Sequence, residues 1–161
     1  MAKSFYSTVL DHTADAVWSF IRSFGDYAWA GVESETIIED GKAGDQVGAI
    51  RRVQIGDRVI RQRLLAHSDI DRCYTYAFLE PAPVRNYQAT IQIVPVVESG
   101  QAFVQWWATF DCTEDALSHW TNFFAHEGFA TWLASLRTVM ADRRQQFVVD
   151  QHRRFVMDQR Q

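Results

Sequence analysis

The spacing of hydrophobic and polar residues changes along the chain, and each change marks a different kind of element. Residues 3–10 are typical of a first β-strand. A short helix is predicted next, because Thr13 can cap its N-terminus and apolar residues recur at helical spacing from Val17 to Ile21. The segment 25–31 has room for one more small helical turn. The first part of the chain therefore predicts one strand and two short helices.

From residue 32 to residue 111 the pattern is that of β-strands. Gly- and Asp-containing turns at 39–45, 55–58 and 97–101 separate the apolar runs, and no helical segment lies between them. Strands joined in this way form an antiparallel meander. We expect about six strands here, and with the first strand about seven.

The last part of the chain has helical periodicity. From about residue 113 to residue 144 there is no Pro and one Gly, and apolar residues recur at steps of three and four. The pattern predicts one long amphipathic helix whose apolar stripe consists of Leu117, Trp120, Phe124, Phe129, Trp132, Leu133, Leu136, Val139 and Met140.

This order of elements predicts an α+β helix-grip fold, in which a curved antiparallel sheet of about seven strands wraps around the long C-terminal helix. Both elements have one apolar face and no other partner. Because a strongly curved sheet and a straight helix do not mesh completely, we expect an internal cavity between them. Residues 1–144 should form one domain, and 145–161 a helical extension or tail that can pack on a second copy in a homodimer.

Composition supports a large ring-lined interior. Aromatic residues make up 14% of the 161 residues, and aromatic side chains bury more area than aliphatic ones. The formal net charge of -4 argues against a nucleic-acid partner. No apolar run is long enough for a signal peptide or a membrane span, so we expect a cytoplasmic protein. Cys73 and Cys112 lack metal-ligand spacing, and no cofactor is implied.

Several stretches occur in an order that resembles one known superfamily. They are Val17-Trp18, Gly48 with Arg51, "RLL" at 63–65, Asn86-Tyr87 after a proline loop, and Trp106 with Phe110 before the last helix. In this the chain resembles the START-like (SRPBCC) helix-grip superfamily, specifically its bacterial polyketide-cyclase-like branch, over roughly residues 3–141. The resemblance implies a cavity for apolar or amphipathic molecules such as lipids, polyketides or terpenoids. The loops typical of the hormone receptors in this superfamily are absent from residues 55–58 and 79–86, so that role is not carried over.

Strand alternation and the resemblance together give a set of candidate ligand contacts. Alternation places every second residue of a strand on the same face, and the resemblance places Trp106 and Phe110 inward. The same period puts Ile60, Gln62 and Leu64 inward on one strand, and Tyr74, Tyr76 and Phe78 on the next. The predicted ligand-binding residues are Trp29, Arg51, Gln62, Tyr76, Phe78, Tyr87, Trp106, Phe110, Phe124, Gly128 and Trp132.

The polar members of this set allow two interpretations. A buried Arg51 requires an anion or several carbonyl groups, so it either pairs within the protein or binds a ligand carboxylate. Many members of the superfamily carry Glu at the position of Gln62, and an amide cannot act as a general base. Each inward ring can equally be packing alone. Gly128 destabilises a helix interior by about 1 kcal/mol relative to Ala, which suggests that a ring or a ligand lies against it.

Two functions follow from the candidate site. The first is binding of a small hydrophobic or amphipathic ligand of the lipid, polyketide or aromatic-acid type. The second is a polyketide cyclase or dehydratase reaction with Tyr76, Tyr87 or His126 as proton carriers. His119 and His126 stand about 10 Å apart along a helix axis, which is too far for a shared metal ion, so no metal site is predicted.

Overall fold

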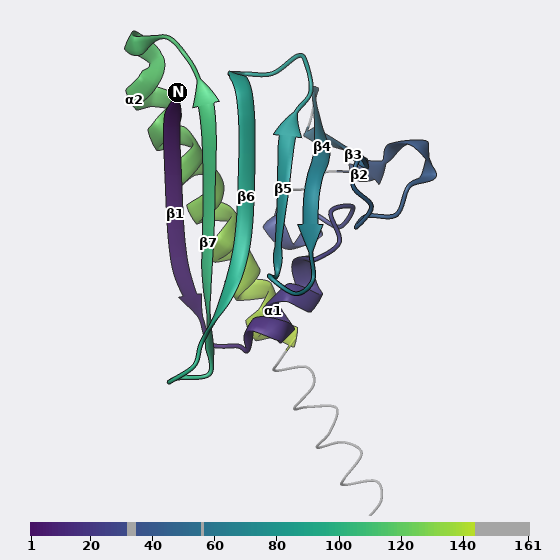
Figure 1. Cartoon of the computed structure of the whole chain (residues 1–161), viewed down its shortest axis with the longest axis vertical. Coiled ribbons are helices and arrows are strands. Elements are labelled where there is room, and N and C mark those ends of the chain that lie inside the picture. Colours follow the sequence, from purple (N-terminus) through teal and green to yellow (C-terminus); the bar gives the residue numbers. More distant parts are fainter. Residues whose placement is uncertain (32–34, 56, 144–161) are drawn as a thin grey trace, which may run out of the picture.

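Seven antiparallel strands form one sheet in the computed structural model, which describes residues 1–31, 35–55 and 57–143 (Figure 1). The order across the sheet is β1-β7-β6-β5-β4-β3-β2. This confirms the predicted meander and the α+β class. The strands are β1 (Ala2–Leu10), β2 (Glu35–Ile38), β3 (Ile50–Ile55), β4 (Arg58–Ser68), β5 (Cys73–Phe78), β6 (Arg85–Val96) and β7 (Gln101–Asp111).

Two short helical segments follow β1, as the sequence predicts. The first is α1 (Ala14–Ile21), and the second is a single 3-10 turn at Ala28–Ala30. The Thr13 hydroxyl accepts a hydrogen bond from the Ala16 amide at 3.2 Å, so the predicted N-terminal cap is confirmed. Another 3-10 turn, Glu39–Gly41, lies in the predicted turn before β3.

The C-terminal helix crosses one face of the sheet (Figure 1). Its helical geometry changes along its length, which corrects the prediction of one continuous α-helix. It begins with a 3-10 turn at Glu114–Ala116, continues as α2 (Leu117–Asn122), widens into a π-helix at Phe123–Ala130, and is α-helical again over 131–143. A π-helix of eight residues is long for a conformation that usually occurs as a single turn, often at a functional site.

Packing against the sheet gives a physical reason for the wide turns. Phe124, Phe129 and Leu133 are all buried, although the first two stand five residues apart and the last two stand four apart. An α-helix of 3.6 residues per turn would rotate residues five apart away from each other, whereas the wider π turn keeps them on one face. The Thr131 hydroxyl donates to the His126 carbonyl at 3.1 Å, which occupies one backbone acceptor in the widened segment.

Side chains of the strands alternate between an inner face against the helix and an outer face. In β7, Val104, Trp106, Ala108 and Phe110 are buried, as predicted, and the residues between them are half-buried. The inward prediction for β4 is correct for Gln62 and Leu64, but Ile60 is only half-buried. The helical segments Leu117–Asn122 and Phe123–Ala130 do not cover this end of β4, since their principal contacts with the sheet are with β1 and β7.

One polar cluster joins α1 to the loops at the end of the sheet, and we call it the surface cluster. It consists of Trp18, Arg22, Asp45 and Asp69. The Asp69 carboxylate accepts from Trp18 Nε1 at 2.8 Å and from Arg22 Nε at 3.0 Å and Nη2 at 2.9 Å. Arg22 also donates to Asp45 at 3.0 Å. One carboxylate therefore satisfies an indole and a guanidinium together.

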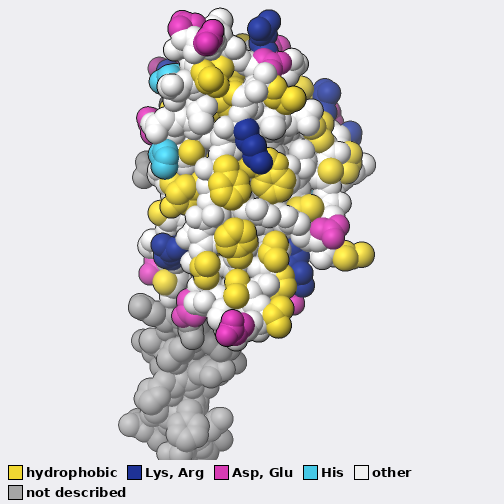
Figure 2. Space-filling view, turned by 60° about the vertical axis from the view of Figure 1, so that its left-hand side comes forward, with side chains coloured by type: hydrophobic (Ala, Val, Ile, Leu, Met, Phe, Trp, Pro, Cys, Tyr) yellow, Lys and Arg dark blue, Asp and Glu magenta, His cyan; other side chains and the backbone are white. Residues whose placement is uncertain are grey.

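The outer face of the sheet also carries apolar side chains. Phe5 of β1 lies opposite Trp107 of β7, and Val9 lies opposite Phe103. Phe5 and Val9 are exposed, and both β7 residues are half-buried. Figure 2 shows apolar side chains gathered on this side of the molecule. The ring content of the strand 101–110 is therefore divided between an inner and an outer face.

In the part of the chain that the structure describes, no helix is long and apolar enough to cross a membrane. The predicted extension at 145–161, and the homodimer contact expected through it, lie outside the described residues.

Candidate functional site

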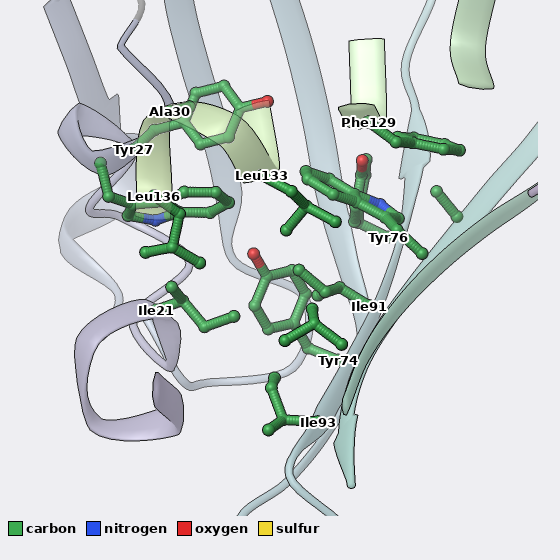
Figure 3. Close-up of a cluster of buried hydrophobic side chains, with 14 of the residues drawn as sticks. Ile21, Tyr27, Ala30, Tyr74, Tyr76, Ile91, Ile93, Phe129, Leu133 and Leu136 are labelled. Carbon is green, nitrogen blue, oxygen red and sulfur yellow. The ribbon is translucent and has the colours of Figure 1, made fainter. Parts of the chain in front are cut away.

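Rings from the sheet, from the segment after α1 and from the C-terminal helix meet in the interior of the molecule. Figure 3 shows Tyr74, Tyr76 and Ile91 on the sheet side, with Leu133 and Leu136 of the helix facing them. We call this group the interior cluster, and define it as Phe24, Tyr27, Trp29, Arg51, Gln62, Tyr74, Tyr76, Tyr87, Trp106, Phe124, Phe129 and Trp132.

Arg51 is the charged residue of the interior cluster, and its side chain is fully buried. It lies on β3 directly opposite Gln62 of β4, so both point to the inner face. Its Nε donates to Gln62 Oε1 at 3.0 Å, its Nη2 donates to the same oxygen, and its Nη1 donates to the Phe24 carbonyl at 3.3 Å. The hydrogen-bond acceptors of this cation are therefore neutral oxygens.

Aromatic faces surround the same guanidinium. Its Cζ lies 4.1 Å from the ring centroid of Phe24, 4.1 Å from that of Tyr27 and 5.4 Å from that of Tyr76. Cation-π attraction partly offsets the desolvation of the charge. Among the described residues no carboxylate forms an ion pair with Arg51. A buried cation in such surroundings favours any negative group that enters the interior.

Two buried polar atoms of the interior cluster have no partner at full hydrogen-bonding geometry in the described part of the chain, although Tyr87 and Trp106 lie close enough to Tyr76 for weak hydrogen bonds that lower its pKa. The two atoms are the Tyr76 hydroxyl and Trp106 Nε1. Tyr76 is 1% exposed and Trp106 is 0% exposed, so bulk water does not reach them. Leaving such a group without a partner costs about 1–3 kcal/mol. Unpaired buried polar groups are uncommon in folded proteins, and each calls for an explanation.

The buried tyrosines are neutral phenols at physiological pH. Burial raises the pKa of Tyr27, Tyr74, Tyr76 and Tyr87 above the usual value, and the positive charge of Arg51 opposes this rise at all four. A neutral phenol donates a hydrogen bond, but it is not a base. The interior therefore offers hydrogen-bond donors and one fixed positive charge.

Most of the predicted ligand contacts are buried in this interior. Phe78 and Trp132 are half-buried. Ring contacts join Phe78 to Tyr87 at 4.1 Å, Tyr87 to Phe124 at 4.9 Å, and Trp106 to Trp132 at 5.3 Å. The buried members of the predicted set are Trp29, Arg51, Gln62, Tyr76, Tyr87, Trp106, Phe110, Phe124 and Gly128.

These rings contact one another across the space between sheet and helix, so an open internal cavity stays a prediction. Trp106 stacks on Phe129 at 4.8 Å and lies 6.0 Å from Trp29. The ring against Gly128 is that of Trp132, whose carbons would lie 3.5 Å from an added Cβ. That distance is an ordinary contact, so Ala fits at position 128 and close packing does not explain the glycine.

A surface pocket of about 420 Å³ opens beside the interior cluster, next to the proline-containing loop 79–86. Phe78 and Tyr87 belong both to this pocket and to the predicted site. Within this loop, Val84 is buried and Glu80 is exposed. The pocket is therefore lined by one ring of the interior cluster, Tyr87, and by Phe78, which contacts it.

The histidines named as candidates lie away from the interior. His119 and His126 are both exposed, and His126 packs edge-on against Tyr6 at 6.3 Å. This corrects His126 as an interior proton carrier: the π segment turns Phe124, Ala125 and Phe129 inward and leaves His126 outside. Cys73 and Cys112 are free and half-buried, and the described residues contain no group of three or more metal-binding side chains.

The set of candidate residues predicted from the sequence omitted several members of the interior cluster. Phe24 and Tyr27 flank the Arg51 guanidinium, yet they come from the irregular segment after α1, where no periodicity assigns a face. Strand alternation places Tyr74 on the inner face of β5, and helical periodicity places Phe129 on the apolar stripe of the C-terminal helix. Neither pattern by itself marks these two residues as ligand contacts. Only the structure shows how closely they approach Arg51 and Trp106.

Comparisons with known proteins agree with this architecture. Similar solved structures include XoxI from Bacillus cereus, with 28% identity, a TM-score of 0.76 and coverage of 89% of this chain and 99% of that one. They also include a protein from Nitrosospira multiformis, with 27% identity, a TM-score of 0.71 and coverage of 84% and 94%, and a protein from Thermobifida fusca, with 25% identity, a TM-score of 0.76 and coverage of 85% and 91%. No curated protein matches. The family model described as "Polyketide cyclase / dehydrase and lipid transport" matches residues 1–144, and the chain therefore belongs to that family.

Proposed function

We propose that the protein binds a small hydrophobic or amphipathic molecule between the inner face of the sheet and the C-terminal helix. The observation that carries this proposal is Arg51: a fully buried cation, flanked by rings and bonded to neutral oxygens. A side chain that only packs would not need a charge in this place, because a buried charge without a counter-ion costs several kcal/mol, on the order given for buried ions. A ligand with a polar end and an apolar body complements both the charge and the rings.

The predicted site residues have two roles in this proposal. Arg51 and Gln62 form the charged end of the site and orient the polar end of the ligand. The walls of the site, most of whose surface is apolar, are Trp29, Tyr76, Phe78, Tyr87, Trp106, Phe110, Phe124, Gly128 and Trp132. Because these rings contact one another, the ligand enters by displacing side chains. The surface pocket lined by Phe78 and Tyr87 is the proposed entrance, because Tyr87 belongs to the interior cluster.

Binding fits the interior better than the alternative, a cyclase or dehydratase reaction. Among the described residues, the buried polar or charged side chains other than tyrosine and tryptophan are Ser4, Arg51 and Gln62. None of these is a base near neutral pH, and burial keeps Tyr76 and Tyr87 protonated. Proton abstraction from a substrate carbon therefore has no base in this interior.

A ligand screen with a matched pair of variants tests the proposal. Fatty acids, polyketide fragments and aromatic acids are added to the wild-type chain, and binding is followed by thermal shift and native mass spectrometry. A ligand at about a hundred times its Kd should stabilise the fold by about 2.7 kcal/mol. Arg51→Met should reduce this gain, whereas Arg63→Met, at an exposed position of β4, should leave it unchanged. If no compound of the screen raises the Tm, packing alone accounts for the rings.

The other expectations from the sequence stay predictions. These are a cytoplasmic location, no nucleic-acid partner, a domain boundary near residue 144 and a homodimer contact through 145–161. The family description includes lipid transport, which supports lipids among the ligands to be tested first.

A further inference from the structure

The two unpartnered atoms of the interior cluster specify one kind of ligand group. Trp106 Nε1 is a donor only, and the neutral Tyr76 hydroxyl can both donate and accept. Both atoms are buried, and the weak contacts of the Tyr76 hydroxyl with Trp106 and Tyr87 leave both without a well-formed hydrogen bond. A ligand atom that receives hydrogen bonds from both must be an acceptor.

The strand register places these donors on the same face with little bulk between them. Tyr76 of β5 is opposite Ala89 of β6, which is opposite Ala108 of β7. Trp106 precedes Ala108 by two residues, so its side chain points to the same inner face. The two alanines between the rings occupy little space.

The positive charge of Arg51 produces an electrostatic field at the Tyr76 hydroxyl. Its Cζ lies 5.4 Å from the Tyr76 ring centroid, and its positive charge opposes the rise in the pKa of the Tyr76 hydroxyl. In a buried site of low effective dielectric such a field remains strong over several ångströms. It favours an acceptor that is negatively charged over one that is neutral.

The surface cluster of the same molecule shows how a carboxylate satisfies this combination of donors. There the Asp69 carboxylate accepts from the Trp18 indole at 2.8 Å and from the Arg22 guanidinium at 2.9 and 3.0 Å. The interior contains an indole, a guanidinium and a phenol, and no described residue supplies a carboxylate to them. A carboxylate from outside the chain has the matching charge and the matching acceptors.

We propose that the ligand is a carboxylic acid bound as its anion, whose carboxylate accepts hydrogen bonds from Trp106 Nε1 and the Tyr76 hydroxyl within the field of Arg51. This inference rests on the proposed function, since it names the ligand class of that site. The apolar body of the acid lies among the surrounding rings, so small fatty or aromatic acids are the ligand class. Tyr76 and Trp106 are thereby assigned as specificity-determining residues.

The test compares each acid with its own uncharged ester. Decanoate, 2-naphthoate and their methyl esters are titrated into the full-length wild-type chain by isothermal titration calorimetry. At least one acid should bind about tenfold or more tightly than its ester, the range expected for hydrogen bonds to a charged group. Tyr76→Phe and Trp106→Phe, which remove the donors and keep rings, should each remove most of that preference, measured as the ratio of acid affinity to ester affinity within the same variant. Trp107→Phe, on the outer face of the same strand, is the matched control and should bind as wild type does.

The outcomes separate this inference from the proposed function. If esters bind as tightly as their acids, or if both variants keep the preference for the acid, the carboxylate assignment is overturned while binding in the interior stands. If none of the four probes binds the wild-type chain, both proposals fail. A thermal melt of each ligand-free variant gives an independent check. If the Tyr76 hydroxyl has no partner in the free protein, the Tm of Tyr76→Phe should equal or exceed that of wild type. A clear fall in Tm would show that the hydroxyl is already satisfied in the free protein, and would overturn the assignment.

Discussion

The surface cluster and the interior cluster use similar donors with opposite outcomes. On the surface, Trp18 and Arg22 both donate to Asp69, and Arg22 also reaches Asp45. In the interior, Arg51 donates to neutral oxygens, and Trp106 Nε1 has no partner among the described residues. The surface site is complete in itself, although water reaches Arg22 and both of its carboxylates. The buried site, where water is largely excluded, is the incomplete one.

This difference distinguishes a polar cluster that stabilises the fold from one whose arrangement points to ligand binding. A fold that required only stability would pair polar groups where desolvation makes them costly, and would leave them unpaired where water can serve. The opposite arrangement here indicates that the interior is shaped for something other than the stability of the free chain. The surface cluster, by contrast, has a structural role, because it joins α1 to the loops that carry Asp45 and Asp69.

The largest expected effect that separates the two clusters comes from alkaline pH. Four of the five tyrosines are buried in the interior, and burial raises the pKa of each. Because the folded-state pKa lies above the unfolded value of about 10, this contribution to stability is fully present below pH 10 and is lost as the pH rises through the folded values. We expect the fold to be lost cooperatively above about pH 10. The phenolate absorbance of the four buried tyrosines and the circular dichroism should then change together; ionisation of all five tyrosines in a chain that keeps its fold would contradict the burial argument.

The next effect in size comes from removing the partner of Arg51. Gln62→Leu leaves Nε and Nη2 of a buried cation without their acceptor, so we expect a loss of about 3 kcal/mol in the free energy of unfolding. The double variant Arg51→Met/Gln62→Leu removes both the charge and its partner, and should recover most of that loss. Urea denaturation measures both. A double variant less stable than Gln62→Leu would mean that Arg51 stabilises the free protein by itself, and the contrast between the clusters would weaken.

The fold follows from local patterns that each element carries in its own residues. Alternation over 101–111 predicts which residues of β7 are buried, and the turn residues at 55–58 and 97–101 predict where the hairpins close. The cap at Thr13 and the helical spacing after it predict α1. These signals are short in range, so one sequence is enough to read them.

The site depends on relations that no local pattern encodes. Tyr27 approaches Arg51 from an irregular segment, and the π turn that sends Phe129 inward and His126 outward arises from packing against the sheet. Whether Arg51 has an anionic partner is a question of three-dimensional contact. Alternation could place Tyr76 and Trp106 on the inner face, but it could not show that their polar atoms are without hydrogen bonds.

Two double-mutant cycles in the ligand-free chain compare the clusters directly. For Trp18→Phe with Asp69→Ala we expect a coupling of about 1–2 kcal/mol, because the indole donates to a charged acceptor at 2.8 Å. For Tyr76→Phe with Trp106→Phe the coupling should be below about 0.5 kcal/mol, because the weak contact between the two polar atoms falls short of full hydrogen-bonding geometry. Urea unfolding of each single and double variant gives both values. A large interior coupling would show that the two donors already satisfy each other.

The smallest expected effect lies at acid pH and concerns the surface cluster. Hydrogen bonds from Arg22 and then Trp18 lower the pKa of Asp69 to about 2. Because the folded-state pKa lies below the unfolded value of about 3.9, the contribution of Asp69 to stability is complete above that value and is lost as the pH falls toward 2. Asp69 is exposed, so solvent screening keeps this contribution modest. Thermal melts between about pH 5 and pH 2 should show a fall in Tm that Asp69→Asn reduces, while Gln62→Leu, in the interior, should leave the slope of that fall unchanged. If Gln62→Leu changed the slope of Tm against pH, a carboxylate of the chain that titrates in this range would have to interact with the interior cluster. The surface cluster, which supplies its own carboxylates, would then no longer differ from the interior cluster, for which we propose a carboxylate from the ligand.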